Sequence, residues 1–235
     1  MTKTEVMKEL ESFGNAQTKK TFLKHGAQEP IFGVRVGDMK KIVKKVKKNH
    51  TLSLELYDTG NADAMYLAGL IADEEKITEE DLQRWAEAAE WYMISEYTVA
   101  WVAADSPYGQ ELGLRWIDSD IPHVAAAGWS TLASVLTVQS DENIDFDRYE
   151  GLLDRVGEQL HQSPNRVRYA MNNFVISVGG YVESLSEKAI EIAEKVGKVH
   201  VNVGDTACKV PEAPAYIRKM HARKMFGKKR KTARC

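Results

Sequence analysis

The sequence predicts an all-α protein in which antiparallel pairs of helices stack into an α-solenoid. Apolar residues recur at helical spacing along almost the whole chain of 235 residues. The connections between these helical segments are short and contain proline or glycine, with no flexible linker that would divide the chain. Only residues 199–203 show even a faint strand pattern, so the sequence lacks the alternation of strands and helices that is typical of a parallel sheet.

Individual helices are predicted from their apolar faces and from the residues at their ends. Thr78 and Asp81 form a capping box at one helix start, Pro107 and Pro122 lie near two others, and Gly197 ends the last helix. The predicted helices span residues 38–49, 62–72, 78–89, 112–117, 124–136, 146–160, 165–178 and 185–196.

The helix pairs recur roughly every 35–45 residues, which is the period of HEAT-like and armadillo (ARM-type) repeats. We therefore expect residues 1–212 to form a single repeat domain, followed by a basic tail at residues 213–235. Because the repeats resemble one another only weakly, an irregular helical bundle is the alternative. A solenoid would present a concave surface to a long partner.

The net charge of −2 conceals an uneven distribution along the chain. Residues 1–52 hold 12 lysines and arginines against 5 acidic residues, a net charge of +7. Residues 53–163 hold 5 against 23, a net charge of −18, and residues 213–235 hold 9 against none. Two basic ends around an acidic middle indicate a polyanionic partner for the ends. A solubilising tail and an acidic solvated surface would explain the same distribution.

Three groups of basic residues are candidates for nucleic-acid contact. The helix predicted at 38–49 places Ile42, Val43 and Val46 on one arc and fills the rest of its surface with lysines: Lys40, Lys41, Lys44, Lys45, Lys47 and Lys48. Because like charges repel, this surface suits a phosphate backbone. The tail supplies a second group: Arg218, Lys219, Arg223, Lys224, Lys228, Lys229, Arg230, Lys231 and Arg234. Arg166 and Arg168 form the third group, for which a plain surface role is an equal alternative.

Several common functional signals are missing from the sequence. The six histidines form no metal-binding pattern, and neither a phosphate-binding glycine loop nor a GxSxG elbow occurs, so we expect no metal and no nucleotide cofactor. No apolar run is long enough for a membrane span, and residues 1–13 lack the core of a signal peptide. Cys208 and Cys235 form no CxxC pair. We therefore expect a cytoplasmic protein without a membrane partner.

Residues 90–101 combine aromatic rings with a carboxylate. In a helix, Tyr92 and Glu96 are four residues apart and share a face. An aromatic ring beside a carboxylate can hold a cationic group, the ring through cation–π attraction and the carboxylate through its charge. The alternative is that Trp91, Tyr92 and Trp101 pack in the core while Glu96 points into solvent.

Four short segments resemble the DNA alkylation-repair family, the AlkD-like glycosylases built from HEAT-like repeats. Residues 32–35, Phe-Gly-Val-Arg, are followed by the basic helix and resemble the family's N-terminal signature. Residues 116–120, Trp-Ile-Asp-Ser-Asp, resemble a second family segment, and residues 91–96 fall where the family has a catalytic Trp-Trp-Asp-x-x-Asp-like stretch. The tail at 204–211 and 227–232 resembles tails in one branch of the family.

The resemblance implies removal of N3- or N7-alkylated purines from DNA. It places Glu96 at the catalytic aspartate, Tyr92 at one aromatic wall and Phe174 near a second wall, and it adds Arg35 to the residues expected to contact DNA. An alkylated purine is already cationic, so a carboxylate that stabilises the oxocarbenium-like sugar and positions water would suffice. Ala126 stands where a phosphate-contacting arginine is expected, and Gly37 where a proline is usual.

These departures leave two alternatives to a glycosylase. One is a non-catalytic relative that binds distorted or branched DNA, and the other is a helical-repeat scaffold that binds proteins. The sequence leaves the oligomeric state open. DNA binding also requires a particular geometry, because the two basic ends of the chain must approach one groove near Glu96.

Overall fold

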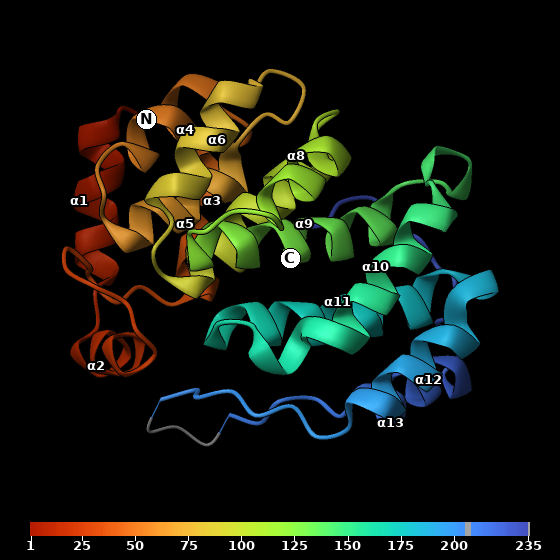
Figure 1. The fold of residues 1–235 in the computed structure, drawn as a ribbon. Coiled ribbons are helices and arrows are strands. Elements are labelled where there is room, and N and C mark those ends of the chain that lie inside the picture. Colours follow the sequence, from red (N-terminus) through yellow and green to blue (C-terminus); the bar gives the residue numbers. More distant parts are fainter. Residues whose placement is uncertain (205–207, 235) are drawn as a thin grey trace.

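The computed structural model describes residues 1–204 and 208–234, which form helices joined by irregular connections (Figure 1). A π-helix, Met93–Val99, continues directly into an α-helix, and short 3-10 turns span 141–143, 160–162 and 183–185. The α-helices are α1 (Lys3–Phe13), α2 (Ala16–Lys24), α3 (Val36–Val46), α4 (His50–Tyr57), α5 (Ala62–Ile71), α6 (Glu79–Ala88), α7 (Ala100–Asp105), α8 (Gly109–Trp116), α9 (Pro122–Val138), α10 (Phe146–Gln159), α11 (Asn165–Tyr181), α12 (Ser186–Val196) and α13 (Ala213–Ala222).

The predicted all-α architecture is confirmed, with two local corrections. The helix predicted at 38–49 ends earlier, at Val46, because Lys47 adopts a positive φ of 59° and Asn49 caps the next helix through Leu52 N at 3.1 Å. The strand prediction for residues 199–203 is wrong: they are irregular, and the described part of the chain contains no strand to pair with them. Residues 205–207 of the family-like tail segment, and Cys235, lie outside the described residues.

Helix α9 joins the two halves of the hydrophobic core. Helices α1 to α8 surround one cluster of buried side chains, to which α9 contributes Val124 and Ala127. Helices α10 to α13 surround a second cluster, to which α9 contributes Ala126 and Trp129. Helix α9 packs mainly against α8 on one side and α11 on the other (Figure 1). Because α9 separates the two halves, side chains of α11 that extend past α9 contact residues of the N-terminal half.

The end of the chain returns to the N-terminal half. Helix α13 packs on α11 and α12, and the residues after it cross the end of α9, where Arg230 N donates to Thr137 O at 2.7 Å. Ala233 is buried against Ala104 and Val135. We call residues 228–234 the C-terminal strap, because this segment links the last helices to the first half of the molecule.

None of the helices in the described ranges combines the length and the apolar character that a membrane crossing requires.

Candidate functional site

The π-helix carries Glu96 into the interior of the molecule. Such wide helical turns occur frequently at functional sites. The π-helix packs closely on α5, where a Cβ atom on Gly69 would lie only 2.5 Å from Thr98 Cγ2. Before the π-helix, the indole nitrogen of Trp91 donates to the carbonyl oxygen of His25 at 3.1 Å. These contacts fix the segment so that Glu96 is buried, with 5% of its surface exposed.

Glu96 forms a two-pronged ion pair with Arg166 of α11. Arg166 Nε donates to Glu96 Oε1 and Arg166 Nη2 donates to Glu96 Oε2, both at 2.6 Å. Burial raises the pKa of Glu96, and the hydrogen bonds and charge of Arg166 oppose that rise. Burial alone would lower the pKa of Arg166, but its hydrogen bonds to Glu96 raise that pKa above the ordinary value. The paired charges neutralise each other.

Two tyrosine rings enclose the same guanidinium group. Arg166 Cζ lies 4.2 Å from the ring centroid of Tyr92 and 4.4 Å from that of Tyr169. Both distances are well within the range of cation–π attraction, about 6 Å. The structure thus brings Tyr92 and Glu96 together around a cation, as the sequence predicts for this helix face. The cation, however, is a side chain of the protein itself.

Phe174 does not line this site, which corrects the sequence prediction. Its side chain is fully buried in the C-terminal core, where the ring stacks on Tyr149 at 5.7 Å and meets Trp129 edge-on at 5.0 Å. The second aromatic wall is Tyr169 instead. Ala126, where the resemblance expects a phosphate-contacting arginine, is also completely buried, so this position of α9 faces the core.

The Phe-Gly-Val-Arg signature is held by a buried aspartate. The backbone N–H groups of residues 32, 33 and 34 donate to the carboxylate of Asp63 at 2.6, 2.9 and 2.8 Å. Gly33 adopts a φ of 81°, and a Cβ there would lie 2.5 Å from Lys19 N, so this position requires glycine. Arg35 follows as the exposed residue before α3. The signature therefore sets the start of the lysine-rich helix.

The lysines of α3 and of the turn after it are exposed, but half of them already have partners. Lys41 pairs with Asp38, Lys45 with Glu9 and Lys48 with Glu74. The other three form no ion pair with any described residue: Lys40, Lys44 and Lys47. These three remain available to phosphate groups. They do not line the cavities beside Glu96, so the predicted convergence of α3 on Glu96 is absent.

The basic residues of the C-terminal strap have different roles. Lys229 Nζ donates to the carbonyl oxygen of Leu136 at 2.9 Å and pairs with Asp141 at 2.8 Å. Lys228, Arg230 and Lys231 are exposed.

Arg168, the other arginine near the start of α11, is half-buried, and its Nε atom has no hydrogen-bond partner in the structure. Lys229 and Arg168 are thus less accessible to DNA than the sequence predicts.

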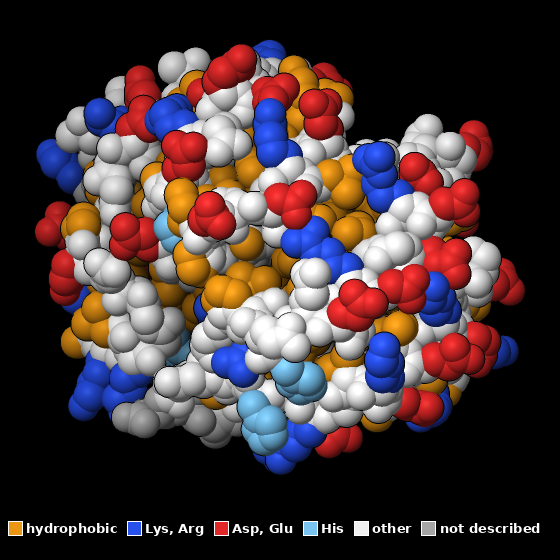
Figure 2. Space-filling model, viewed as in Figure 1, with side chains coloured by type: hydrophobic (Ala, Val, Ile, Leu, Met, Phe, Trp, Pro, Cys, Tyr) orange, Lys and Arg blue, Asp and Glu red, His pale blue; other side chains and the backbone are white. Residues whose placement is uncertain are grey.

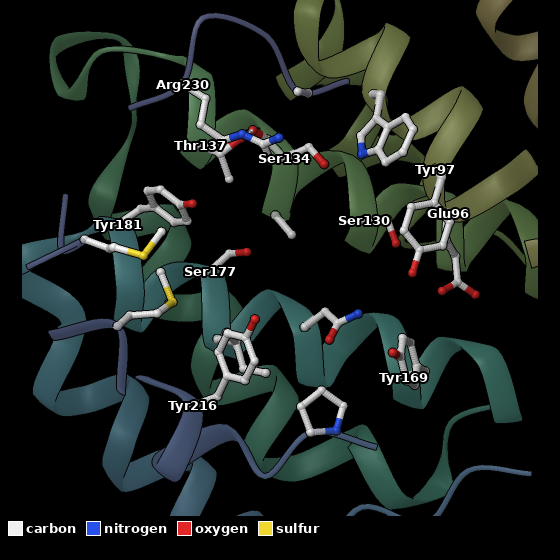
Figure 3. Close-up of a pocket in the computed structure, with 18 of the residues that line it drawn as sticks. Glu96, Tyr97, Ser130, Ser134, Thr137, Tyr169, Ser177, Tyr181, Tyr216 and Arg230 are labelled. Atoms are coloured by element: carbon white, nitrogen blue, oxygen red, sulfur yellow. Dashed lines mark hydrogen bonds between the residues drawn. The ribbon is translucent and has the colours of Figure 1, made fainter. Parts of the chain in front are cut away.

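Two cavities flank the Glu96–Arg166 pair. The first, of about 410 Å³, is lined by Tyr92, Arg166 and Tyr169 together with Lys24 and Lys209. We call it the Arg166 cavity. The second, of about 530 Å³, is shown in Figure 3 and lies between α9, α11, α13 and the C-terminal strap, with Glu96 at one end. We call it the Tyr216 cavity, after a tyrosine of α13 in its lining.

Sequence reasoning missed some of these lining residues. Tyr169 lies three residues after Arg166 and therefore on the same face of α11, a spacing that could have identified it. Lys24 and Lys209 carry no such signal, because they reach the site from distant parts of the chain. Within residues 1–204 and 208–234, no group of three or more histidine, cysteine, aspartate or glutamate side chains is placed to hold a metal ion.

Comparison with known proteins agrees with this architecture. Two relatives are the uncharacterized proteins Lin0241 of Listeria innocua, 36% identical, and Lmo0209 of Listeria monocytogenes, 37% identical, each aligned over 92% of this chain and 95% of the relative. A solved structure with a TM-score of 0.91 and 41% identity, covering 100% of both chains, belongs to a new family of proteins related to the HEAT-like repeat DNA glycosylases with affinity for branched DNA structures. The family model for DNA alkylation repair enzymes matches residues 6–217, and this chain belongs to that family.

Proposed function

We propose that this protein binds branched DNA and does not hydrolyse the glycosidic bond of alkylated purines. The observation that carries the proposal is the position of Arg166 between Tyr92, Tyr169 and the carboxylate of Glu96. A cationic alkylated base would need the same aromatic walls and the same carboxylate. The protein's own guanidinium group therefore takes the place of the substrate cation.

Displacing Arg166 would be costly. Breaking a buried ion pair by removing one partner costs about 3–5 kcal/mol, which corresponds to a penalty of about 10²–10⁴-fold on binding of a base. The pair also reduces the electrostatic help that Glu96 can offer, because its charge is already balanced by Arg166 when an oxocarbenium-like sugar would need it. Binding without base removal is the function that this site supports best.

DNA contact is supported by the distribution of basic side chains. Lys40, Lys44 and Lys47 form one unpaired group on the N-terminal half, and the Tyr216 cavity carries a second group of cations at α13 and the strap. Figure 2 shows that acidic side chains dominate the surface over α10 and α12, which would repel phosphates. The two basic regions do not share one groove at Glu96, so each would neutralise phosphates on a different arm of a branched molecule. The relative with affinity for branched DNA structures supports this choice of partner.

The second candidate function is removal of alkylated purines. It is favoured by membership of the family and by the burial of Glu96 beside Tyr92, the positions that the resemblance assigns to the catalytic carboxylate and one aromatic wall. This function requires Arg166 to leave the site when DNA binds. It remains a prediction that a direct assay decides.

The deciding experiment is base release from duplex DNA that contains N7-methylguanine or N3-methyladenine. We expect the wild type to release no more base than the Glu96→Gln variant. A gel shift of the same preparations with a four-way junction shows that the proteins are folded and bind DNA. Release by the wild type that disappears in Glu96→Gln would overturn the proposal and establish the glycosylase.

A further inference from the structure

We propose that the Tyr216 cavity binds an unpaired nucleotide of branched DNA, with the base against its tyrosine rings and the phosphate on its unpaired cations. This inference rests on the proposed function and names the part of the protein that would contact an unpaired nucleotide of the branched DNA. The cavity measures about 530 Å³, within the range of about 300–1,000 Å³ typical of sites for small molecules. A space of this size admits a single nucleotide but not a duplex.

The aromatic lining of the cavity suits a nucleobase. Tyr97 lies at one end, Tyr169 and Tyr181 extend from α11, and Tyr216 lies on α13 (Figure 3). Trp101 also lines the cavity. Tyr216 is unusually accessible for a large aromatic side chain, with 47% of its surface exposed. Unpaired bases stack on such rings, and each stacked base contributes about 1–3 kcal/mol. The rings therefore supply a surface that accepts any base.

The charges at the cavity suit a phosphate group. Lys219, Arg223 and Arg230 line it, and none of the three forms an ion pair with a described residue. Arg218, the neighbour of Lys219, instead points away to pair with Glu194 at 2.5 Å. Glu96 is the single carboxylate among the described lining residues, and Arg166 neutralises it. The cavity thus holds three uncompensated positive charges in a chain whose net charge is −2.

Hydroxyl groups complete the lining. The side chains of Ser130, Ser134 and Ser177 face the cavity between α9 and α11, as Figure 3 shows. Their hydroxyl groups make no hydrogen bond with the described part of the chain. A hydroxyl group can both donate and accept a hydrogen bond, so these serines can contact the edge of any base. Aromatic faces, cations and unoccupied hydroxyl groups together match a nucleotide better than an apolar ligand or a peptide.

The direct test is titration of the full chain with the 5′-phosphorylated dinucleotide pTpT, followed by calorimetry. We expect binding that weakens at least tenfold in Arg223→Ala and in Tyr216→Ala. Arg218→Ala is the matched control, because it removes an adjacent exposed cation that does not line the cavity, and we expect a change of less than twofold. Irradiation with a dinucleotide that carries 5-iodouracil should crosslink to the peptide containing Tyr216. Absence of binding, or equal losses in Arg223→Ala and Arg218→Ala, would overturn the proposal.

Two further DNA ligands separate this inference from the proposed function. Wild-type protein should bind a junction with one single-stranded arm more tightly than a fully paired junction, and Arg223→Ala should remove that preference. If Arg223→Ala binds both junctions as the wild type does, the cavity proposal fails while branched-DNA binding stands. If the wild type binds neither junction, the proposed function fails, and the dinucleotide titration still decides whether the cavity is a nucleotide site. Thymidine monophosphate bound as tightly as the single-stranded arm would identify a free-nucleotide site and overturn the DNA assignment.

Discussion

At the scale of single residues, the centre of the molecule is an arginine bound by the groups that could bind a cationic base. Glu96 supplies the charge and Tyr92 and Tyr169 supply the ring faces, all around Arg166. The tyrosines flank the guanidinium plane, and two of its three nitrogens, Nε and Nη2, reach the carboxylate. The same residues that would make a base-excision site here make a rigid internal contact between the π-helix and α11.

Replacing Arg166 alone should destabilise the protein. Arg166→Ala leaves the Glu96 carboxylate buried without a partner, and we expect a loss of about 3–5 kcal/mol in the free energy of unfolding, measured by urea denaturation at pH 7. The double variant Arg166→Met with Glu96→Leu removes both charges and should recover most of this loss. If Arg166→Ala unfolds with the wild-type free energy, the pair contributes nothing and Arg166 is free to leave the site.

The sequence predicts part of this residue-level arrangement. The four-residue spacing of Tyr92 and Glu96 correctly places a ring beside a carboxylate. Arg166 is predicted only as a DNA contact, because nothing local shows that it meets a carboxylate 70 positions earlier in the chain. Phe174 is misplaced because the resemblance locates the second aromatic wall only approximately along α11, and the packing of α11 on α9 and α10 turns this position into the core.

At the scale of elements, the π-helix packs closely on α5. The sequence treats a helix at residues 90–101 only as a condition for pairing Tyr92 with Glu96, whereas the capping box, prolines and terminal glycine predict most other helices to within a few residues. The sequence pattern does not predict the wide turn, and nothing near it in the sequence signals that Thr98 packs against the bare backbone of Gly69. Helices α1, α2, α4, α7 and α13 are not predicted individually, since short helices give weak periodicity.

Substitution of Gly69 tests whether the π-helix requires its close contact with α5. A Cβ at Gly69 would lie 2.5 Å from Thr98 Cγ2, so Gly69→Val should lower the free energy of unfolding by about 1–3 kcal/mol and displace Glu96. Gly151→Ala in α10 is the control, because no atom lies within 4 Å of the added Cβ, and it should stabilise the protein by about 0.5–1 kcal/mol. Thermal unfolding of both variants measures the difference. A Gly69→Val protein as stable as the wild type would contradict the account of the π-helix.

At the scale of the whole molecule, the C-terminal strap brings the two basic ends of the chain together. Arg234 pairs with Glu74 at 2.7 Å and with Asp105 at 3.1 Å, and it donates to the carbonyl oxygen of Ala72 at 2.8 Å. Glu74 also contacts Lys48 at the end of α3. Residues from both ends thus meet at one carboxylate, although α3 itself stays away from Glu96. DNA binding requires the two basic ends to approach one groove near Glu96, and the structure instead joins them through the acidic side chains of Glu74 and Asp105.

The strap should make stability depend on pH. Burial alone would raise the pKa of Glu74, but Lys48 and Arg234 lower it from the ordinary value of 4.5 to about 2. A lowered pKa in the folded state contributes stability above about pH 4.5, and this contribution is lost as pH falls towards 2. With allowance for partial exposure, we expect Glu74→Gln to cost about 1–2 kcal/mol at pH 7 and almost nothing at pH 2. Denaturant unfolding between pH 2 and pH 7 measures the difference in the free energy of unfolding between the wild type and Glu74→Gln. A difference that does not change with pH would contradict the role of Glu74.

The whole charge distribution also predicts how the protein binds DNA. Each phosphate contact releases counterions, so the logarithm of the affinity should fall with the logarithm of salt concentration by about 0.9 per contact. Replacing Lys40, Lys44 and Lys47 together by alanine should reduce that slope, whereas replacing the paired Lys45 should change it little. Gel shifts with a four-way junction at several salt concentrations give both slopes, and identical slopes would exclude this face of α3 from the interface.

The most direct test of the central claim is the ratio of dissociation constants for a four-way junction and a duplex of matched length, measured with the wild type in the same buffer. We expect the junction to bind at least tenfold more tightly, since only a branched molecule offers separate arms to the two basic regions. Equal affinity for junction and duplex, or no affinity for either, would contradict it.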